Sequence, residues 1–371
     1  MRRVHSAQAL RILCEALSPD AGGAAAIAHR REVRDWPAVL ALANTHYLGP
    51  AMYAALSQAE DWPMLPAELR DYLALLHRQN NSRNRRLRQQ AEELFAACNA
   101  AGVRAMLLKG GLALFLDHYP DPAARMIRDL DLLVPAVQAE AALAVLRRLG
   151  YAAMALYPAG HNAYGDFARA GDAGAVDLHF ELIDAPYLLP AADVWQRADR
   201  LELAAGRCFI PSLADRLLHN LLHAQIHHIG AFYRGSIELR QLHDFTMLAR
   251  RHRDGIDWPA LAAHCARHRL TLTLQSYLLA AGLFGLDWPL DEAPSAAARR
   301  QLRRCLMQIR APFLERLGLP LANLCAAFAP HRMDGLYGQR QSLLRRRLRH
   351  AAQFLKKSNR NGVVARLFKA Y

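Results

Sequence analysis

Two aspartates, Asp129 and Asp131, stand one residue apart in the run DLDLLV. Side chains alternate between the faces of a strand, so both carboxylates point to one face, about 7 Å apart, and the leucines to the other. Such a pair repels itself unless a cation or a base holds it, and carboxylates are typical Mg²⁺ ligands. In a chain with 33 acidic residues an Asp-x-Asp also arises by chance, and a charged strand end is the alternative.

A second chemical feature, Lys109-Gly110-Gly111, lies upstream of this aspartate pair. The apolar run 103–108 before it predicts a strand, and residues 112–118 after it predict a short helix. Glycines let the backbone turn sharply, and the start of a helix offers free N–H groups to a phosphate. We therefore expect a phosphate-binding turn with a lysine beside it; an ordinary strand-to-helix turn is the alternative.

A third acid, Asp177, lies in the later strand-like run AVDLHFEL. Alternation places Asp177, His179 and Glu181 on one face and the apolar residues on the other. The alternative is a half-exposed strand with a polar side. Arg125 and Arg128 precede the aspartate pair, where they either neutralise phosphate charge or counter the aspartates themselves.

These features together resemble the polymerase-β-type nucleotidyltransferase superfamily, with its Gly-Gly, an Asp-x-Asp on the next strand and a separate acid on a later strand. The closer likeness is to a poorly characterised bacterial branch, the uncharacterised nucleotidyltransferase or NTP-transferase-5 family. That branch looks like Lys-Gly-Gly, an arginine four residues before Asp-hydrophobic-Asp, and a later Asp-Leu-His. The residues that carry the likeness are Lys109, Gly110, Gly111, Arg125, Asp129, Leu130, Asp131, Asp177, Leu178 and His179. The gap between the glycines and the aspartate pair is longer than in the antibiotic-modifying members.

The resemblance implies an enzyme dependent on Mg²⁺ (or Mn²⁺) that moves a nucleoside monophosphate from an NTP to an acceptor and releases pyrophosphate. ATP is the default NTP, and the acceptor group is a hydroxyl or a phosphate. The acceptor itself stays open between a small molecule, a peptide or protein, and RNA. The implied catalytic and metal-binding residues are Asp129, Asp131 and Asp177, the last also a candidate base; the implied nucleotide contacts are Lys109, Gly110, Gly111, Arg125, Arg128 and His179. Two rivals are a non-catalytic protein of this fold that binds RNA or a partner through a basic helical surface, and a metal-dependent phosphohydrolase.

The later run DRLLHNLLHAQIHH repeats histidines at helical spacing after Asp215. A polar seam against the core is the favoured interpretation, and a metal site is the alternative. Related sequences also carry a histidine in this helix and an aspartate in a following one. His223 and Asp244 are the matching positions, which implies contacts to the acceptor or the nucleotide. Arg240 lies four residues before Asp244 and either joins that site or pairs with the aspartate.

The expected fold class is α+β, a small mixed twisted β-sheet nucleotidyltransferase core flanked by N-terminal and C-terminal helical lobes. The resemblance implies this fold, whereas periodicity alone indicates only α+β. The expected divisions are a helical region at 1–100, the α/β core at 101–211, and a helical domain with a basic tail at 212–371. The expected strands lie near 103–108, 129–134, 151–157, 162–170, 175–182 and 207–210, and the expected helices near 67–100, 136–149, 213–228, 235–252, 258–268, 270–284, 295–316 and 340–357.

The composition bounds the partners and the compartment. A net charge of +14 suits a polyanionic partner. Six scattered cysteines, without a CxxC pair, favour free thiols in a reducing compartment, hence a cytoplasmic location. We expect no transmembrane segment, because no apolar run reaches 18 residues. The oligomeric state is left open.

Basic residues gather in two places. The expected helix at 67–100 carries Arg83, Arg85, Arg86 and Arg88, which we interpret mainly as a solvated face. No acid follows Asp334, whereas ten basic residues do. In this tail an apolar stripe is expected to pack while the arginines stay solvated; binding to RNA or a membrane surface is the alternative. The stripe comprises Leu344, Leu348, Ala351 and Leu355.

Overall fold

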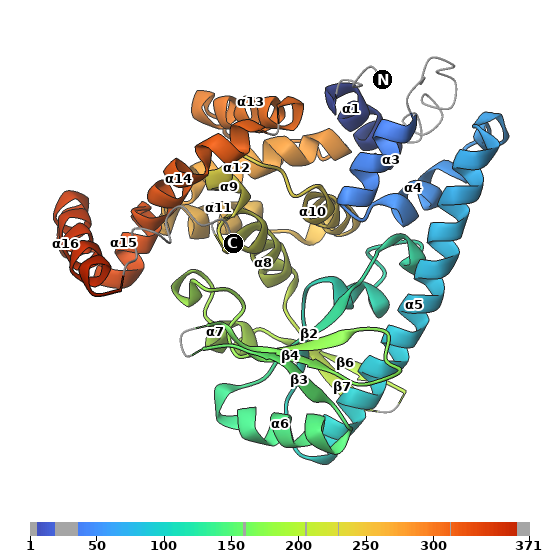
Figure 1. Cartoon of the computed structure of the whole chain (residues 1–371), viewed down its shortest axis with the longest axis horizontal. Coiled ribbons are helices and arrows are strands. Elements are labelled where there is room, and N and C mark those ends of the chain that lie inside the picture. The colour runs from blue at the N-terminus through green and yellow to red at the C-terminus, as the bar shows by residue number, and fades with distance from the viewer. Residues whose placement is uncertain are drawn as a thin grey trace. The chain divides into compact units, whose positions relative to one another are not determined.

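The chain divides into two compact units, coloured by residue number in Figure 1. The computed structural model describes residues 6–18, 36–158, 161–204, 206–228, 230–311 and 313–361. The first unit comprises Met1–Asn220, Leu239–Ile256 and Ala281–Asp287, and the second comprises Leu221–Glu238, Asp257–Ala280 and Trp288–Tyr371. The division of the chain at residues 100 and 211 stays a prediction.

A mixed sheet of seven strands forms the centre of the first unit, in the order β3-β4-β5-β2-β1-β7-β6 among the described residues. The strands are β1 Met106–Leu107, β2 Asp129–Leu133, β3 Ala152–Leu156, β4 Ala163–Ala168, β5 Ala175–His179, β6 Asp199–Leu203 and β7 Gly206–Ile210. The β2–β5 and β1–β7 pairs are parallel, and the other neighbouring pairs are antiparallel. This sheet, together with the helices around it, confirms the predicted α+β class.

Local sequence signals located most strands but not all. The first strand is shorter than expected, Met106–Leu107, and β6 was not predicted. β6 lies at the edge of the sheet and its residues are exposed or half-buried, so it lacks the apolar signature of a strand. The helix expected at 112–118 is instead a 3₁₀ helix, η2 Lys109–Leu114, which starts at the lysine itself.

Helices before and after the strands complete the first unit. They are α1 Ser6–Leu17, α3 Trp36–Thr45, α4 Gly49–Leu56, α5 Ala67–Ala100, α6 Ala139–Arg148, α7 Ala191–Gln196, the first part of α8 Leu213–Gln225, and α10 Leu239–Arg251. Short 3₁₀ turns lie at η1 Trp62–Met64, η3 Pro122–Ala124, η4 Ala136–Gln138, η5 Pro186–Leu188, η6 Arg253–Gly255 and η7 Gly282–Phe284. The long helix α5 has the predicted bounds. A proline precedes it and no proline interrupts it, so one amphipathic pattern runs along its length.

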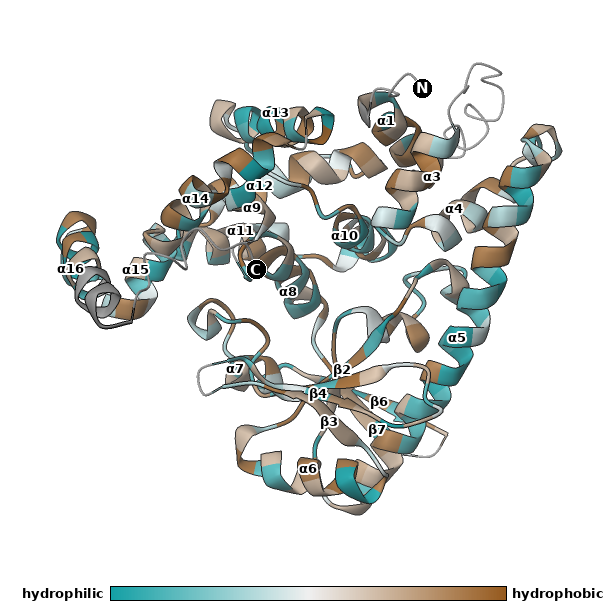
Figure 2. Ribbon diagram, in the orientation of Figure 1, coloured by the Kyte–Doolittle hydropathy of each residue, from teal (hydrophilic) through white to brown (hydrophobic). Residues whose placement is uncertain are grey.

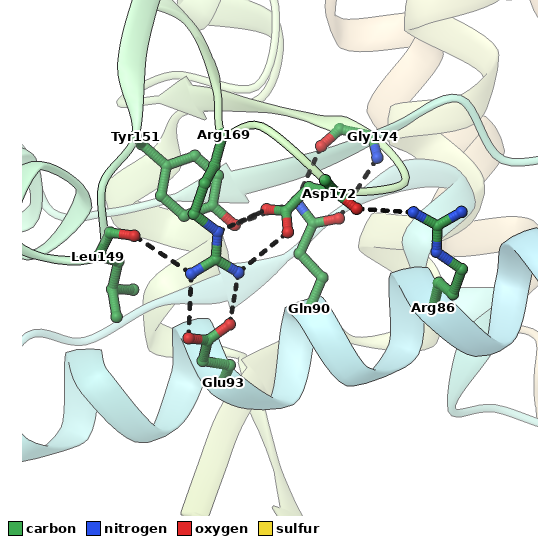
Figure 3. Close-up of polar contacts among 9 residues, drawn as sticks. Arg86, Gln90, Glu93, Leu149, Tyr151, Arg169, Asp172 and Gly174 are labelled. Carbon is green, nitrogen blue, oxygen red and sulfur yellow. Dashed lines mark hydrogen bonds and ion pairs between the residues drawn. The ribbon is translucent and has the colours of Figure 1, made fainter.

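Many residues of α5 are hydrophilic (Figure 2). Several of these polar side chains hold loops of the first unit in place. Figure 3 shows the turn 169–174, just before β5, held in this way. The Gln90 amide donates to the Gly174 carbonyl at 2.8 Å, and Arg169 forms a two-pronged ion pair with Glu93 at 3.0 and 2.6 Å. This network fixes the start of β5 relative to α5.

Of the arginines at 83, 85, 86 and 88 of α5, all but Arg83 are exposed, as a solvated face requires. This face is not only solvated, because three of these four arginines also donate to backbone carbonyls of the first unit. The pairs are Arg83 with Ile127 and Arg128, Arg86 with Gly171, and Arg88 with Leu114. A charge run on a helix looks the same in sequence whether its arginines face water or carbonyl groups, because only the tertiary fold brings those carbonyls near.

Helices are the only regular elements among the described residues of the second unit. It contains the end of α8, then α9 Ala231–Arg234, α11 Trp258–Arg267, α12 Thr271–Ala281, α13 Ala296–Arg310, α14 Phe313–Ala327, α15 Pro330–Tyr337 and α16 Leu343–Asn361. The single helix expected at 295–316 is in fact interrupted after Arg310, since Ala311 leaves the helical conformation with φ −136° and ψ 75°.

The basic helix α16 packs opposite to the expected way. Arg346 is buried, donates to the Gly338 carbonyl at 2.9 Å and forms an ion pair with Asp334. Leu344 and Leu348 of the supposed packing stripe are instead 67% and 61% exposed. The side chain of Leu355 lies outside the described residues. Arg346, which has a carboxylate partner within reach, therefore faces inward on this helix, whereas Leu344 and Leu348 face outward.

Two further expectations concern cysteines and membranes. All six cysteines are free thiols, five of them buried. Across the described ranges, every helix is too short or too polar to cross a lipid bilayer.

Candidate active site

Strand pairing brings two of the three predicted aspartates together. β2 and β5 are parallel neighbours, and their register places Asp131 directly opposite Asp177. Asp131 is buried, whereas Asp177 is half-buried. On the other face of these strands Leu130 and Val176 are fully buried, which fixes the register, because a slip by one residue would put leucines in the polar site.

His179 joins the two carboxylates. Its Nε2 lies 2.8 Å from Asp177 Oδ2 and 3.1 Å from Asp131 Oδ1. The other ring nitrogen, Nδ1, lies 3.2 Å from the side-chain amide nitrogen of Asn162. The ligand atoms of the two aspartates and the histidine all lie within 4.8 Å of one another. Asp177 Oδ1 is buried and has no hydrogen-bond partner among the described residues.

Lys109 also reaches this cluster. Its Nζ lies 2.6 Å from Asp131 Oδ1 and 3.4 Å from His179 Nε2. The backbone of Lys109 is in the left-handed region, with φ +49°, where residues other than glycine are uncommon and strained. Strain of this kind persists only where surrounding contacts enforce it, and here the ion pair to Asp131 is such a contact.

The two aspartates of β2 have opposite electrostatic surroundings. Burial by itself would raise the pKa of Asp131, but Lys109 and His179 together hold it far below its usual range. The pKa of Asp129 is raised, first by burial and then by the neighbouring Asp131 charge. No hydrogen bond reaches the Asp129 carboxylate from the described part of the chain. Asp129 is therefore a half-buried carboxylate without an ion-paired partner among the described residues, and the Lys109 and Arg128 charges offset the rise in its pKa only in part.

Arg125 lies against the glycine turn but pairs with a distant aspartate. A Cβ on Gly110 would stand 2.9 Å from Arg125 Nη2, so only glycine allows the guanidinium this close. Arg125 Nε contacts Asp244 Oδ1 at 2.7 Å, and the Tyr119 hydroxyl donates to the same oxygen. The counter-ion of Arg125 is thus Asp244 rather than the aspartates of β2.

Arg128 and Arg240 meet on one aromatic ring. The guanidinium carbons of Arg128 and Arg240 lie 5.4 and 5.2 Å from the centre of the Tyr47 ring. No described residue forms an ion pair with either arginine. Arg240, which the spacing suggested as a partner of Asp244, instead stacks on this ring.

Helix α5 positions the segment that leads into β2. The Asn80 amide donates to the carbonyls of Ala123 and Arg125, at 2.6 and 3.0 Å, and Asn84 donates to Arg125 at 2.8 Å. Arg83 donates to the Ile127 carbonyl at 2.8 Å. Polar groups at 80, 83 and 84 on one helix therefore set where Arg125, Arg128 and Asp129 lie.

The histidine run of α8 does not form the suggested metal site with Asp215. That aspartate pairs with Arg197 at 2.8 Å and accepts from the Ser212 hydroxyl at 2.7 Å. Its backbone N–H donates to the Ser212 hydroxyl oxygen at 3.2 Å, as in a helix cap. His219 is buried, near Lys109 and His179, and burial lowers its pKa to about 3, so it is neutral. His223 belongs to the second unit, where its ring lies 4.9 Å from that of His227. Glu181 accepts a hydrogen bond from the Ala191 backbone at 3.0 Å.

Several residues of this site were not predicted. They are Tyr47, Asn80, Arg83, Asn84, Tyr119, Asn162 and His219. The polar positions of α5 carried a usable signal, because buried asparagines inside a long helix need hydrogen-bond partners elsewhere. Tyr47 and Tyr119 carried none, since their partners lie far away in the sequence.

The second unit has a pocket of its own, of about 560 Å³. It is lined by Phe232, Tyr233, Arg269, Leu270, Leu272, Thr273, Leu324, Cys325, Phe328, Ala329, Pro330, His331 and Arg347. None of these is acidic, so the pocket lacks the carboxylates that hold a hard cation. The acidic candidates for chemistry are the aspartates of the first unit.

Comparison with known proteins gives one match. A family model described as an uncharacterised nucleotidyltransferase matches residues 32–285. That range contains every residue of the candidate site described above, from Tyr47 to Asp244. No curated protein and no solved structure matches the chain. Since the family model covers more than half of the sequence, the chain belongs to this family of uncharacterised nucleotidyltransferases.

Proposed function

We propose that this protein transfers a nucleoside monophosphate from an NTP to an acceptor hydroxyl, or phosphate, with release of pyrophosphate and with Mg²⁺ or Mn²⁺ as cofactor. The observation that carries the proposal is the position of Asp131 opposite Asp177 on parallel strands, with Asp129 on the same face of β2. The family adds the expectation of nucleotidyl transfer.

The donor set fits a hard divalent cation. Asp177 Oδ1 is a buried carboxylate oxygen without a partner, and such atoms are costly unless a ligand satisfies them. Burial and Asp131 raise the pKa of Asp129, and a cation would relieve both effects. Asp129, Asp131 and Asp177 would hold the ion, which when bound supplies Lewis-acid activation of the phosphate and of the attacking hydroxyl.

The chain's own residues then position the reactants. His179 donates to both Asp131 and Asp177, which orients the two carboxylates. Asp177, with one oxygen free of hydrogen bonds, is the candidate acceptor for the proton of the attacking hydroxyl. Lys109 and the glycine turn lie beside these groups and would offer an ammonium and backbone N–H donors to the phosphates. ATP remains the default donor, and the site does not select among acceptors.

One observation favours the non-catalytic alternative. The Lys109 ammonium already neutralises Asp131 at 2.6 Å, as it would in a protein that keeps the fold and has lost its metal. A phosphohydrolase is the other rival. These alternatives differ in their products, because a transferase releases pyrophosphate, a hydrolase acting on the terminal phosphate releases phosphate, and a binding protein releases neither.

The experiment that tests the proposal incubates the full-length chain with α-labelled and γ-labelled NTPs, Mg²⁺, and separate RNA, protein and metabolite fractions. We expect α-label, but not γ-label, to enter one fraction, and pyrophosphate to appear in the same amount. Asp131→Asn and Asp129→Asn should reduce this transfer at least a hundredfold. Transfer at the wild-type rate in both variants would refute the assignment, as would release of phosphate alone.

A further inference from the structure

Two arginines from distant parts of the first unit are stacked on the same tyrosine. Tyr47 follows α3 in a turn, and its backbone is in the left-handed region with φ +56°. A tyrosine rarely adopts this conformation without a functional or packing reason. Here it presents one ring to Arg128 and Arg240 at 5.4 and 5.2 Å, within the range of cation–π contacts.

No ion pair compensates the positive charge at this ring in the described part of the chain, although Asp129 and Asp244 act on Arg240 electrostatically without contacting it. Neither Arg128 nor Arg240 forms a side-chain hydrogen bond with a described residue. The nearest carboxylate of α10, Asp244, is already occupied by Arg125 and Tyr119. Arg125 and Asp244 therefore neutralise each other, and Asp244 is not left to pair with Arg128 or Arg240.

Stacking on a ring leaves the edge of a guanidinium available. The ring restrains the plane of each guanidinium while its N–H groups remain free to donate. Two such edges match a phosphate group, which accepts several charge-assisted hydrogen bonds at once. Arg128 is the residue immediately before Asp129, so a phosphate bound at its edge lies beside the carboxylates of β2.

We propose that Tyr47, Arg128 and Arg240 form a clamp for the β- and γ-phosphates of the donor nucleotide. This inference rests on the proposed nucleotidyl transfer, and it assigns the triphosphate tail mainly to two arginines held by a tyrosine. Lys109, which the sequence singled out for this task, contacts Asp131 instead. Tyr47 is a positioning residue in this scheme, since it acts through the arginines.

Binding of inorganic tripolyphosphate to the full-length chain tests the clamp without catalysis. The titration is done in EDTA, so that no metal bridges the ligand to the aspartates. We expect Arg240→Gln and Arg128→Gln each to weaken binding at least tenfold, and Tyr47→Leu to weaken it similarly. Tyr47→Phe keeps the ring and should bind like the wild type, as should Arg200→Gln, which removes an exposed arginine on β6. Wild-type affinity in both Arg240→Gln and Arg128→Gln would overturn the proposal.

Further measurements separate the clamp from the proposed function and from other phosphate sources. Asp131→Asn should lose transfer and still bind tripolyphosphate. If the wild type binds tripolyphosphate through the clamp but transfers nothing, the proposed function fails alone. If transfer occurs and the KM for the NTP is unchanged in Arg240→Gln, the clamp fails alone.

A single-stranded RNA oligonucleotide without a triphosphate should compete poorly with tripolyphosphate, and stronger competition by RNA would overturn the assignment to the donor nucleotide. Thermal unfolding of each variant identifies any that fails to fold. In that case the affinities of Tyr47→Phe and Arg128→Gln for tripolyphosphate are compared, and they decide whether the clamp binds this ligand.

Discussion

Lys109 is the residue at which charge and backbone strain coincide. Its Nζ lies 2.6 Å from Asp131 although its φ is +49°. Burial by itself would lower the pKa of this lysine, but Asp131 and the neighbouring aspartates raise it, so the ammonium stays charged. Lys109 thus occupies one oxygen of the carboxylate that the proposed function assigns to a metal ion.

Replacement of Lys109 by methionine separates these effects, because methionine leaves the backbone strain unchanged and removes only the charge. We expect the metal-free variant to be less stable by about 3 kcal/mol, since a buried carboxylate loses its main partner. We also expect saturating Mg²⁺ to raise its melting temperature more than that of the wild type, because the ion replaces the ammonium. A variant that melts like the wild type and does not respond to Mg²⁺ would argue against a cation site at Asp131.

At the scale of elements, α5 organises the site through side chains that a helix does not need for its own stability. Asn80 and Asn84 are buried and donate to carbonyls of η3 itself and to the carbonyl of Arg125, which follows it. Their partners lie about forty residues downstream, in the segment that enters β2. Because backbone carbonyls of this segment have no sheet partner, the asparagines replace the hydrogen bonds that a regular element would supply.

Asn80→Ala should therefore reduce stability by about 1–3 kcal/mol, since the Ala123 carbonyl loses its side-chain donor and the Arg125 carbonyl keeps only that of Asn84. It should also weaken NTP binding, because Arg125 and Arg128 are in the segment that Asn80 holds. Gln89→Ala is the matched control, an exposed amide on the same helix. Chemical denaturation and nucleotide titration measure both effects, and equal behaviour of the two variants would show that α5 does not position the site.

In the second unit, the ion pair between the buried Arg346 and the half-buried Asp334 fastens α16 to α15. Burial by itself would raise the pKa of Asp334, but hydrogen bonds from Arg346 and Arg269 lower it. A carboxylate with a lowered pKa in the folded state contributes stability above its unfolded pKa of about 4, and that stability is lost as the pH falls. The leucines exposed on α16 contribute no comparable burial.

Arg346→Met should increase hydrogen exchange in α15 and α16 and cost about 1.5–3 kcal/mol, because Asp334 loses one charged hydrogen bond and keeps that of Arg269. Arg345→Met, at the exposed neighbouring position, should change neither. As the pH falls from about 5 to about 3, protection of these helices should decrease in the wild type and much less in Asp334→Asn. An equal decrease in both proteins would exclude Asp334 as the titrating group.

At the scale of the whole molecule, the sequence predicted features that depend on local pattern. The bounds of α5 and the aspartates of β2 were readable because helical and strand periodicities are local. The pairing of Asp131 with Asp177 needed the sheet order, in which β5 lies beside β2 although α6 and two strands separate them in the chain. Long-range partners such as Asp244 for Arg125, or Tyr47 for Arg240, depend on the tertiary fold and leave no local trace.

The same distinction explains the errors in the second unit. The leucine stripe of α16 satisfied the helical period, so it predicted an apolar packing face. In the structure Arg346 is the buried residue instead, because it forms an ion pair with the carboxylate of Asp334 near the helix. Periodicity reports which residues share a face but not what lies opposite that face.

Mn²⁺ binding to the full-length chain, followed by electron paramagnetic resonance, tests the central claim most directly, since free and bound Mn²⁺ are distinguished without any acceptor. We expect the wild type to bind Mn²⁺, more tightly when a non-hydrolysable NTP analogue is present. Asp177→Asn should weaken binding at least tenfold, and Asp199→Asn, at an exposed position on β6, should not change it. Absence of Mn²⁺ binding in the wild type, or unchanged affinity in Asp177→Asn, would contradict a metal site at Asp129, Asp131 and Asp177.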